Sequence, residues 1–329
     1  MTIIERKDAR HFSQELLDLF DRYVHGLIDR ATFLEQAAKF ATGGVTAAGL
    51  LEALSPRFAE AQQVAPDDKR LVTESVEYES PLGSGKVRAY SARPADAKGK
   101  LPAVLVVHEN RGLNPHIADV TRRLALEGFS TLAPDALSPV GGYPGDEDKA
   151  REAFAKLDQA KAREDFIAGV GYLKNSRGGT GRVGAVGFCY GGGIVSLLAS
   201  RVPDLAAAVP FYGLQPKEED VARIRAPLLI HYAEHDERIN AGIPAFEQAL
   251  HASRIDYQLY TYAGTQHGEL ARVVRRPQNA VSKSVSQGRP PVGPGFLRAS
   301  QQRDAPKFGT AAGERSIRCP QGAAAVPVT

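Results

Sequence analysis

The chain has 329 residues, of which 43% are hydrophobic and 24% are charged, with 32 glycines, 21 prolines and no tryptophan. These proportions exclude a wholly disordered chain, a collagen and a coiled coil. No uncharged apolar run reaches the roughly 18 residues of a membrane-spanning helix, so stable membrane insertion is not expected. Two cysteines without a CxxC pair exclude both a disulfide framework and a zinc ribbon.

The net charge of +3 is distributed unevenly along the chain. Residues 269–329 contain ten Lys and Arg against three Asp and Glu, whereas the other 268 residues contain 31 against 35. The body of the protein is therefore mildly acidic. Because it shows neither a basic stripe nor a nucleic-acid motif, nucleic-acid binding is not expected.

Residues 1–66 are predicted to form a helical N-terminal extension, because apolar side chains recur at helical spacing over residues 12–39. The extension also carries a partial twin-arginine export pattern: Arg30, Phe33 and Leu34, an uncharged stretch from residue 40 to 51, and the triplet Ala59-Glu60-Ala61. Ala31 replaces the second arginine, which favours a cytoplasmic protein. Export to the periplasm with removal of residues 1–61 is the alternative.

Residues 67–268 are predicted to form an α/β domain. Six apolar runs typical of buried parallel strands lie at residues 102–109, 129–135, 182–188, 205–212, 227–234 and 257–263. Helical patterns lie between them, as at residues 118–128 and 148–175. This alternation indicates a mostly parallel sheet covered by helices on both faces.

The strongest motif is RVGAVGFCYGGGIVSLLAS, in which a predicted strand runs into a predicted helix. Its centre, Gly187-Phe188-Cys189-Tyr190-Gly191, has the G-x-S-x-G form of a nucleophile elbow with cysteine in place of serine. Glycines are needed because side chains two positions before and after the nucleophile would collide with neighbouring backbone. The helix N-terminus favours a thiolate, and the Tyr190 N–H can face a developing oxyanion. We therefore predict that Cys189 is a nucleophile rather than a small buried apolar residue.

A nucleophile of this kind needs a base and a group that orients the base, in the chain order nucleophile, acid, histidine. Asp236 follows the apolar run 227–234, and His267 follows the run 257–263. Both positions are strand carboxyl ends, where the sites of open α/β sheets gather. We expect His267 to hold or deprotonate the Cys189 thiol and Asp236 to orient the imidazole.

The segment VLVVHENRGLNPH ends another predicted strand, at the place where this architecture has its second oxyanion donor. The Asn110 N–H is expected to complete the oxyanion hole, and Glu109 is expected to hydrogen-bond the resting thiol. His108 and His116 lie in the same segment without a third ligand at a suitable spacing, so no metal is expected.

Together these motifs resemble those of the dienelactone hydrolases (carboxymethylenebutenolidases), which are α/β-hydrolases with a cysteine nucleophile. The resemblance covers about residues 70–268 and rests on VLVVHENRGLNPHIADVTRRLA, APDALSPVGGYPGDEDKAREAFAKL, GRVGAVGFCYGGG, PLLIHYAEHDERI and YAGTQHG. It implies a triad of Cys189, Asp236 and His267, acting on small esters or lactones without a cofactor. It also implies that Glu109 protects the resting cysteine until substrate displaces it, and that Arg151 holds a substrate carboxylate.

Residues 269–329 depart from the family pattern, which usually continues with a long amphipathic helix packed on the sheet. Seven prolines, six glycines and only two aromatic residues indicate an irregular basic tail. Ala271 stands where a second carboxylate-binding arginine is expected. We interpret the abrupt change as a reading-frame shift near residues 268–269, which translation of the 3′ end of the coding DNA in the other two frames would test.

Two other functions stay open on the sequence. Fold and triad do not fix the acyl group, so a thioesterase or a carboxylesterase with another substrate is one alternative. A non-catalytic redox sensor, in which an exposed Cys189 oxidises reversibly, is the other. The sequence sets neither the physiological substrate nor the oligomeric state.

Overall fold

The computed structural model describes residues 11–42, 44–55 and 62–268. The predicted irregular tail and the triplet Ala59-Glu60-Ala61 lie outside the described residues. The structure therefore does not test the interpretation of the tail as the product of a reading-frame shift. Among the described residues, no helix has both the length and the apolar character that crossing a bilayer requires.

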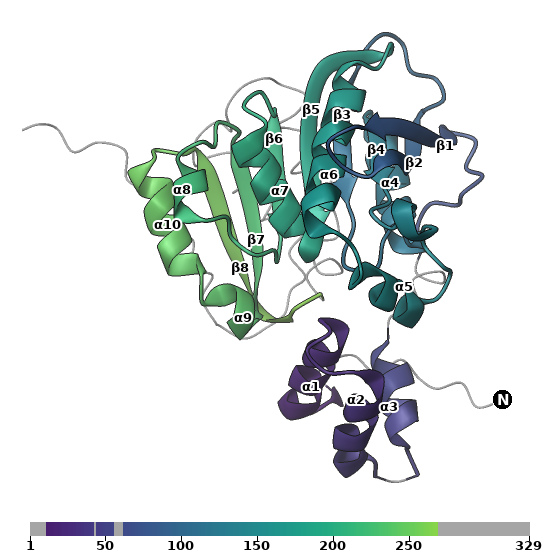
Figure 1. Cartoon of the computed structure of the whole chain (residues 1–329), viewed down its shortest axis with the longest axis vertical. Coiled ribbons are helices and arrows are strands. Elements are labelled where there is room, and N and C mark those ends of the chain that lie inside the picture. The colour runs from purple at the N-terminus through teal and green to yellow at the C-terminus, as the bar shows by residue number, and fades with distance from the viewer. Residues whose placement is uncertain (1–10, 43, 56–61, 269–329) are drawn as a thin grey trace, which may run out of the picture.

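The described chain begins with three short helices and continues into an eight-stranded sheet with its own helices (Figure 1). The first helices are α1 (Gln14–Val24), α2 (Arg30–Ala37) and α3 (Ala47–Leu54). The strands are β1 (Leu71–Ser80), β2 (Gly85–Pro94), β3 (Leu101–Val107), β4 (Ser130–Pro134), β5 (Gly179–Phe188), β6 (Ala207–Phe211), β7 (Leu228–His235) and β8 (Tyr257–Gln266). The later helices are α4 (Pro115–Leu126), α5 (Glu147–Phe154), α6 (Gln159–Lys174), α7 (Tyr190–Arg201), α8 (Glu218–Val221), α9 (Glu237–Asn240) and α10 (Ile243–Ala252).

The strand order is β1-β2-β4-β3-β5-β6-β7-β8. β1 pairs with β2, and β2 with β4, in antiparallel fashion, and the remaining pairs are parallel. The predicted mostly parallel α/β sheet is therefore confirmed, and the six apolar runs correspond to β3–β8. The predicted helical stretch 148–175 is two helices, because Asp158 caps α6 by accepting the N–H groups of Ala160 and Lys161.

Helices cover the sheet on both sides because its central strands are apolar on both faces. In β3, Leu105 and Val107 belong to the core under α6, α7 and α10, while Val104 and Val106 belong to the core under α4. A strand buried on both faces reads as a continuous apolar run rather than as an alternating pattern. The strand carboxyl ends thereby gather at one edge, supported from both sides.

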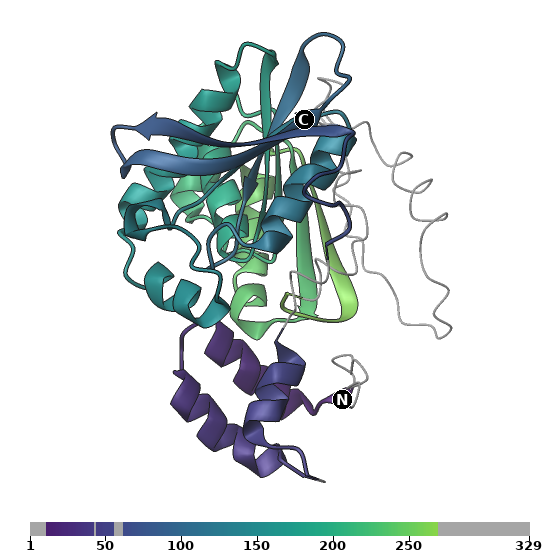
Figure 2. The same cartoon turned by 90° about the vertical axis from the view of Figure 1, so that its right-hand side faces the viewer.

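The first three helices form a small bundle with its own apolar core, which we call the N-terminal helical segment (residues 11–55). Phe33, of the export-like pattern, is fully buried in this core beside Leu50 and Leu51. In two perpendicular views the bundle lies at one end of the sheet rather than on either of its faces (Figures 1 and 2). The helical nature predicted for residues 12–39 is confirmed, while the domain boundaries and the cellular compartment stay predictions.

Candidate active site

The chain turns sharply at Cys189, between the last residue of β5 and the first residue of α7. Cys189 has φ of 54° and ψ of −114°, a backbone conformation that non-glycine residues rarely adopt. Its N–H donates to the Phe211 carbonyl oxygen at 3.0 Å, and its own carbonyl oxygen accepts the Gly192 N–H at 3.0 Å. The surrounding backbone therefore holds the strained turn that the elbow motif predicts.

The glycines on either side of the turn are there because backbone lies where a side chain would start. A Cβ at Gly187 would lie 2.2 Å from the carbonyl oxygen of Gly191. A Cβ at Gly191 would lie 2.3 Å from the carbonyl oxygen of Val107 and 2.7 Å from that of His108. The collision with neighbouring backbone that the sequence predicts is confirmed.

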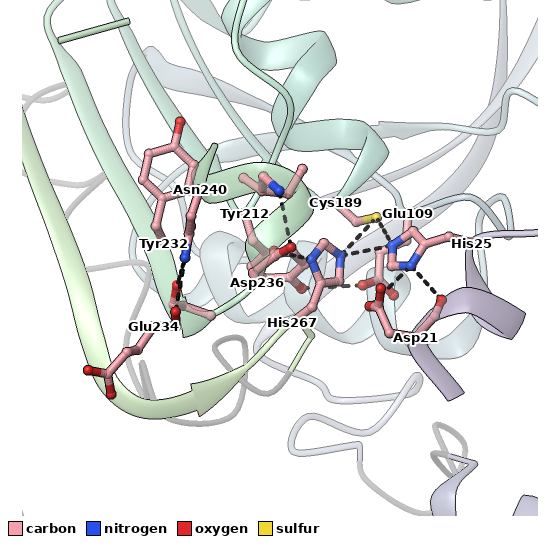
Figure 3. A network of polar contacts seen from close by, with 12 residues as sticks. Asp21, His25, Glu109, Cys189, Tyr212, Tyr232, Glu234, Asp236, Asn240 and His267 are labelled. Atoms are coloured by element: carbon pink, nitrogen blue, oxygen red, sulfur yellow. Dashed lines mark hydrogen bonds and ion pairs between the residues drawn. The ribbon is translucent and has the colours of Figure 1, made fainter. Parts of the chain in front are cut away.

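The three predicted triad residues lie in one chain of contacts (Figure 3). His267 Nε2 is 3.3 Å from Cys189 Sγ, and His267 Nδ1 bonds to Oδ2 of Asp236. The side chains of His267 and Asp236 are 8% and 2% exposed. Asp236 is also fixed by its position as the N-cap of α9, where Oδ1 accepts the Ile239 N–H at 3.3 Å. A buried carboxylate thus sets the orientation of the imidazole.

These contacts favour a thiolate. Burial raises the pKa of the Cys189 thiol, but the positive charge of His267 and hydrogen bonds from His25 and His267 lower this pKa to about 6. Burial lowers the pKa of His267, whereas the Cys189 thiolate and Asp236 raise it to about 10. Near neutral pH the pair is therefore a thiolate beside an imidazolium.

A histidine that the sequence analysis did not single out also touches the sulfur. His25 lies at the C-cap of α1, and its Nε2 is 3.4 Å from Cys189 Sγ and 3.1 Å from His267 Nε2. Its Nδ1 faces Asp21, at 2.8 Å from the carbonyl oxygen and 3.1 Å from Oδ1 (Figure 3). The pKa of His25 is raised to about 9: burial lowers it, and hydrogen bonds to Asp21 and Cys189 outweigh that effect.

Nothing local in the sequence marks His25 as part of a site. It is 164 positions from Cys189, and Asp21 four residues earlier is an ordinary pair on one face of a helix. Only the docking of the N-terminal helical segment at the carboxyl edge of the sheet brings the two together.

Glu109 and Asn110 lie at the end of β3, beside the site, and are engaged with other partners. The Glu109 carboxylate accepts the Tyr212 hydroxyl at 3.2 Å and lies 3.5 Å from the Arg111 guanidinium. The Asn110 side chain donates to the Val24 carbonyl oxygen at 2.8 Å. Among the described residues, the sulfur has hydrogen bonds with His25 at 3.4 Å and His267 at 3.3 Å, so the expected bond from Glu109 to the resting thiol stays a prediction. The oxyanion roles of the Asn110 and Tyr190 N–H groups stay predictions too.

Arg151, the predicted carboxylate holder, lies on α5 and faces the N-terminal helical segment. Its guanidinium lies 4.0 Å above the centre of the Tyr23 ring and bonds to Asp148. To hold a substrate carboxylate, the Arg151 guanidinium would have to bind it in addition to Tyr23 and Asp148, or in place of them. This role of Arg151 stays a prediction.

Two family profiles match parts of this chain. The sequence profile of the dienelactone hydrolase family matches residues 87–287, and a second profile, described as YqhI-like, matches residues 4–39. A protein of Methylorubrum extorquens assigned as a carboxymethylenebutenolidase is 33% identical over 262 residues, covering 74% of this chain and 88% of that protein. The hydrolase fragment YghX of Escherichia coli is 54% identical over 114 residues, covering 35% of this chain and 97% of the fragment.

A solved structure agrees with these matches. The crystal structure of a protein assigned as a dienelactone hydrolase from Klebsiella pneumoniae superposes with a TM-score of 0.54 at 27% identity, covering 70% of this chain and 98% of that one. The first profile spans more than half of the chain and includes the sheet from β3 to β8. The chain belongs to the dienelactone hydrolase family, α/β-hydrolase enzymes that cleave carboxylic esters.

Proposed function

We propose that this protein hydrolyses a small ester or lactone through an acyl-enzyme on Cys189, with His267 as the proton carrier and Asp236 as the group that orients it. One observation carries the proposal. A continuous chain of contacts runs from the Asp236 carboxylate through the His267 ring to Cys189 Sγ, at a strained strand-to-helix turn. This is the arrangement that an activated nucleophile requires.

In the first half of the reaction the Cys189 thiolate attacks the carbonyl carbon. A C–S bond forms, and the carbonyl π electrons move to oxygen, where the N–H groups of Tyr190 and Asn110 are the proposed donors. The oxyanion then collapses, the C–O bond breaks, and the His267 imidazolium gives its proton to the leaving alkoxide. With a lactone, the released hydroxyl stays attached to the acyl group.

In the second half, water cleaves the thioester. Neutral His267 takes a proton from the water as the oxygen attacks, and the second oxyanion collapses with breakage of the C–S bond. The products are the carboxylic acid and the Cys189 thiolate, again beside an imidazolium. The Asp236 carboxylate keeps His267 in the tautomer that directs Nε2 at the sulfur.

The acyl group that fits the proposal best is small and carries a carboxylate. The name carboxymethylenebutenolidase, given to the Methylorubrum relative, denotes a lactone with a carboxyl group. Arg151 and Arg111 are two cations of the described part of the chain that could hold such a carboxylate, and Arg111 already lies 3.5 Å from Glu109. A substrate carboxylate would compete with Glu109, Glu147 and Asp148 for these guanidinium groups.

The pH dependence of hydrolysis tests the proposal. For an uncharged alkyl ester, kcat/KM is expected to rise as the pH passes about 6, because Cys189 is the inactive thiol below its pKa and the thiolate above it. It is expected to fall near pH 10, where His267 loses the proton that the leaving group needs. The two apparent pKa values belong to Cys189 and His267 as a coupled pair rather than to either residue alone.

The matched variant is Asp236→Asn, which keeps the shape and removes the negative charge. Its falling limb should move to lower pH, because the carboxylate helps to hold the proton on His267. A wild-type rate that still rises through about pH 8.5, where an ordinary thiol titrates, would contradict the thiolate mechanism.

A further inference from the structure

Three atoms that commonly bind metal ions face one another at the centre of the site. Cys189 Sγ is 3.4 Å from His25 Nε2 and 3.3 Å from His267 Nε2, and the two nitrogens are 3.1 Å apart (Figure 3). Among residues 11–42, 44–55 and 62–268, this is the one group of three or more such ligands whose atoms lie within 4.8 Å of one another.

The other nitrogen of each ring is committed to an acceptor. His267 Nδ1 bonds to the Asp236 carboxylate, and His25 Nδ1 faces both the carbonyl oxygen and the carboxylate of Asp21. These partners place a hydrogen on each Nδ1, so that each Nε2 directs a lone pair at the sulfur once it gives up the proton it carries in the imidazolium. Three electron-rich atoms then meet at one point, and a positive charge has to lie among them. Protons supply that charge in the resting enzyme, and a metal ion would bind all three atoms at once.

The spacing of the triangle fits a tetrahedral ion. With metal–sulfur bonds of about 2.3 Å and metal–nitrogen bonds of about 2.0–2.1 Å, the ligand atoms of a Zn²⁺ site lie about 3.6 Å apart for S···N and about 3.3 Å for N···N. The three observed distances differ from these by a few tenths of an ångström. Histidine ligands usually donate their second N–H to a carboxylate or a carbonyl, and both histidines here do so.

From this arrangement we propose that Cys189, His25 and His267 form a binding site for a thiophilic divalent transition-metal ion such as Zn²⁺, with the fourth position open to water. Binding displaces the protons that the cluster holds and changes no oxidation state. The ion takes the sulfur lone pair with which the thiolate attacks a carbonyl, so metal binding and acyl transfer exclude each other. That exclusion rests on the function proposed for Cys189, whereas metal binding itself does not.

The site would join two parts of the chain. His25 belongs to the N-terminal helical segment and to the stretch matched by the YqhI-like profile, whereas Cys189 and His267 lie within the dienelactone hydrolase match. The two parts already meet through the Asn110 side chain on Val24 and through Arg151 over Tyr23. A metal ion would add a bond from each part and hold the N-terminal helical segment closed over the nucleophile.

Cobalt titration of the full-length, chelator-treated protein tests the proposal, because tetrahedral Co²⁺ bound to a thiolate absorbs strongly in the visible and near ultraviolet. We expect one Co²⁺ per chain, with a sulfur-to-cobalt charge-transfer band, and displacement by Zn²⁺. His25→Ala should weaken binding by about 100-fold or more, because changes merely to outer partners of a ligand already cost about 10–100-fold. Cys189→Ala should abolish the charge-transfer band.

Two further variants keep the test decisive if His25→Ala disturbs folding. Asp21→Asn, which removes the charged acceptor of His25 Nδ1 and leaves the carbonyl acceptor in place, should weaken Co²⁺ binding by about 10-fold. His251→Ala, on α10 with its ring against Tyr257, is the matched histidine control and should leave the titration unchanged. Binding without the charge-transfer band, or binding equally tight in His25→Ala and in wild type, would overturn the proposal.

Measuring both the cobalt spectrum and acyl-enzyme formation distinguishes a failure of the metal site from a failure of the proposed function. Metal-free wild type that shows the cobalt spectrum but forms no acyl-enzyme supports the metal site and contradicts the acyl-transfer role. Acyl transfer that Zn²⁺ inhibits as strongly in His25→Ala as in wild type would overturn the three-ligand site and leave the hydrolase mechanism standing.

Discussion

Cys189→Ala is expected to lower kcat/KM for an ester substrate by roughly 10,000-fold or more, with little change in thermal stability. Removing the nucleophile of a triad removes the covalent pathway altogether, and only binding and oxyanion stabilisation remain. Alanine is close to cysteine in size, and the backbone bonds that hold the turn, from residue 189 to Phe211 and Gly192, do not use the side chain. Steady-state hydrolysis by metal-free protein, beside a thermal unfolding curve, measures both effects.

The chain supplies a matched control, because its only other cysteine is Cys319, in the part of the chain outside the described residues. Cys319→Ala should hydrolyse the ester at the wild-type rate. If Cys189→Ala kept more than about a tenth of the wild-type rate, the nucleophile would have to be another residue.

Gly191→Ala should disrupt the elbow, and with it both folding and activity. The new methyl group would lie 2.3 Å and 2.7 Å from the carbonyl oxygens of Val107 and His108, which are backbone atoms of a central strand end and cannot turn aside. Overpacking of this kind costs about 1–3 kcal/mol, and any movement of the turn also displaces the Cys189 sulfur from His267. We expect a lower free energy of unfolding in a denaturant titration and at least a 100-fold loss of kcat/KM, in line with the cost of misplacing a reacting group by about 1 Å.

Gly193→Ala is the control for this substitution, two residues further along the same helix. There the nearest atom to a new Cβ is the Leu214 carbonyl oxygen at 3.6 Å, an ordinary contact. Alanine at a helical position without a clash is expected to stabilise by about 0.5–1 kcal/mol relative to glycine. Equal behaviour of the two variants would mean that the close approach at Gly191 does not exist in solution.

The sequence predicted the parallel part of the sheet well and missed its antiparallel edge. Strands β3–β7 are largely apolar and buried, and this makes them visible as continuous runs, whereas β8, with the sequence YQLYTYAGTQ, is mostly half-buried or exposed. β1, with the sequence LVTESVEYES, has buried residues at only three positions, and much of it is exposed. Because a strand of this kind has no apolar run, its place is decided by pairing with β2 rather than by its own pattern.

The site divides in the same way. The proximity of Cys189, Asp236 and His267 was predictable, because a strained turn and two strand ends place these residues at the same edge of the sheet, whereas their catalytic roles stay a proposal. His25 was not, because its role depends on how a separate helical bundle docks at the edge of the sheet. For Glu109, the sequence predicted the position at the strand end but not the contacts. Its partners Tyr212 and Arg111 depend on side-chain packing, which the sequence pattern does not show.

Rapid-quench hydrolysis of p-nitrophenyl acetate by metal-free protein tests the central claim most directly. A cysteine acyl-enzyme predicts a burst of nitrophenol close to one equivalent per chain. It also predicts an acetyl group on the peptide that contains Cys189 in the quenched protein. Steady turnover without a burst and without an acetylated Cys189 peptide would contradict covalent catalysis by this residue.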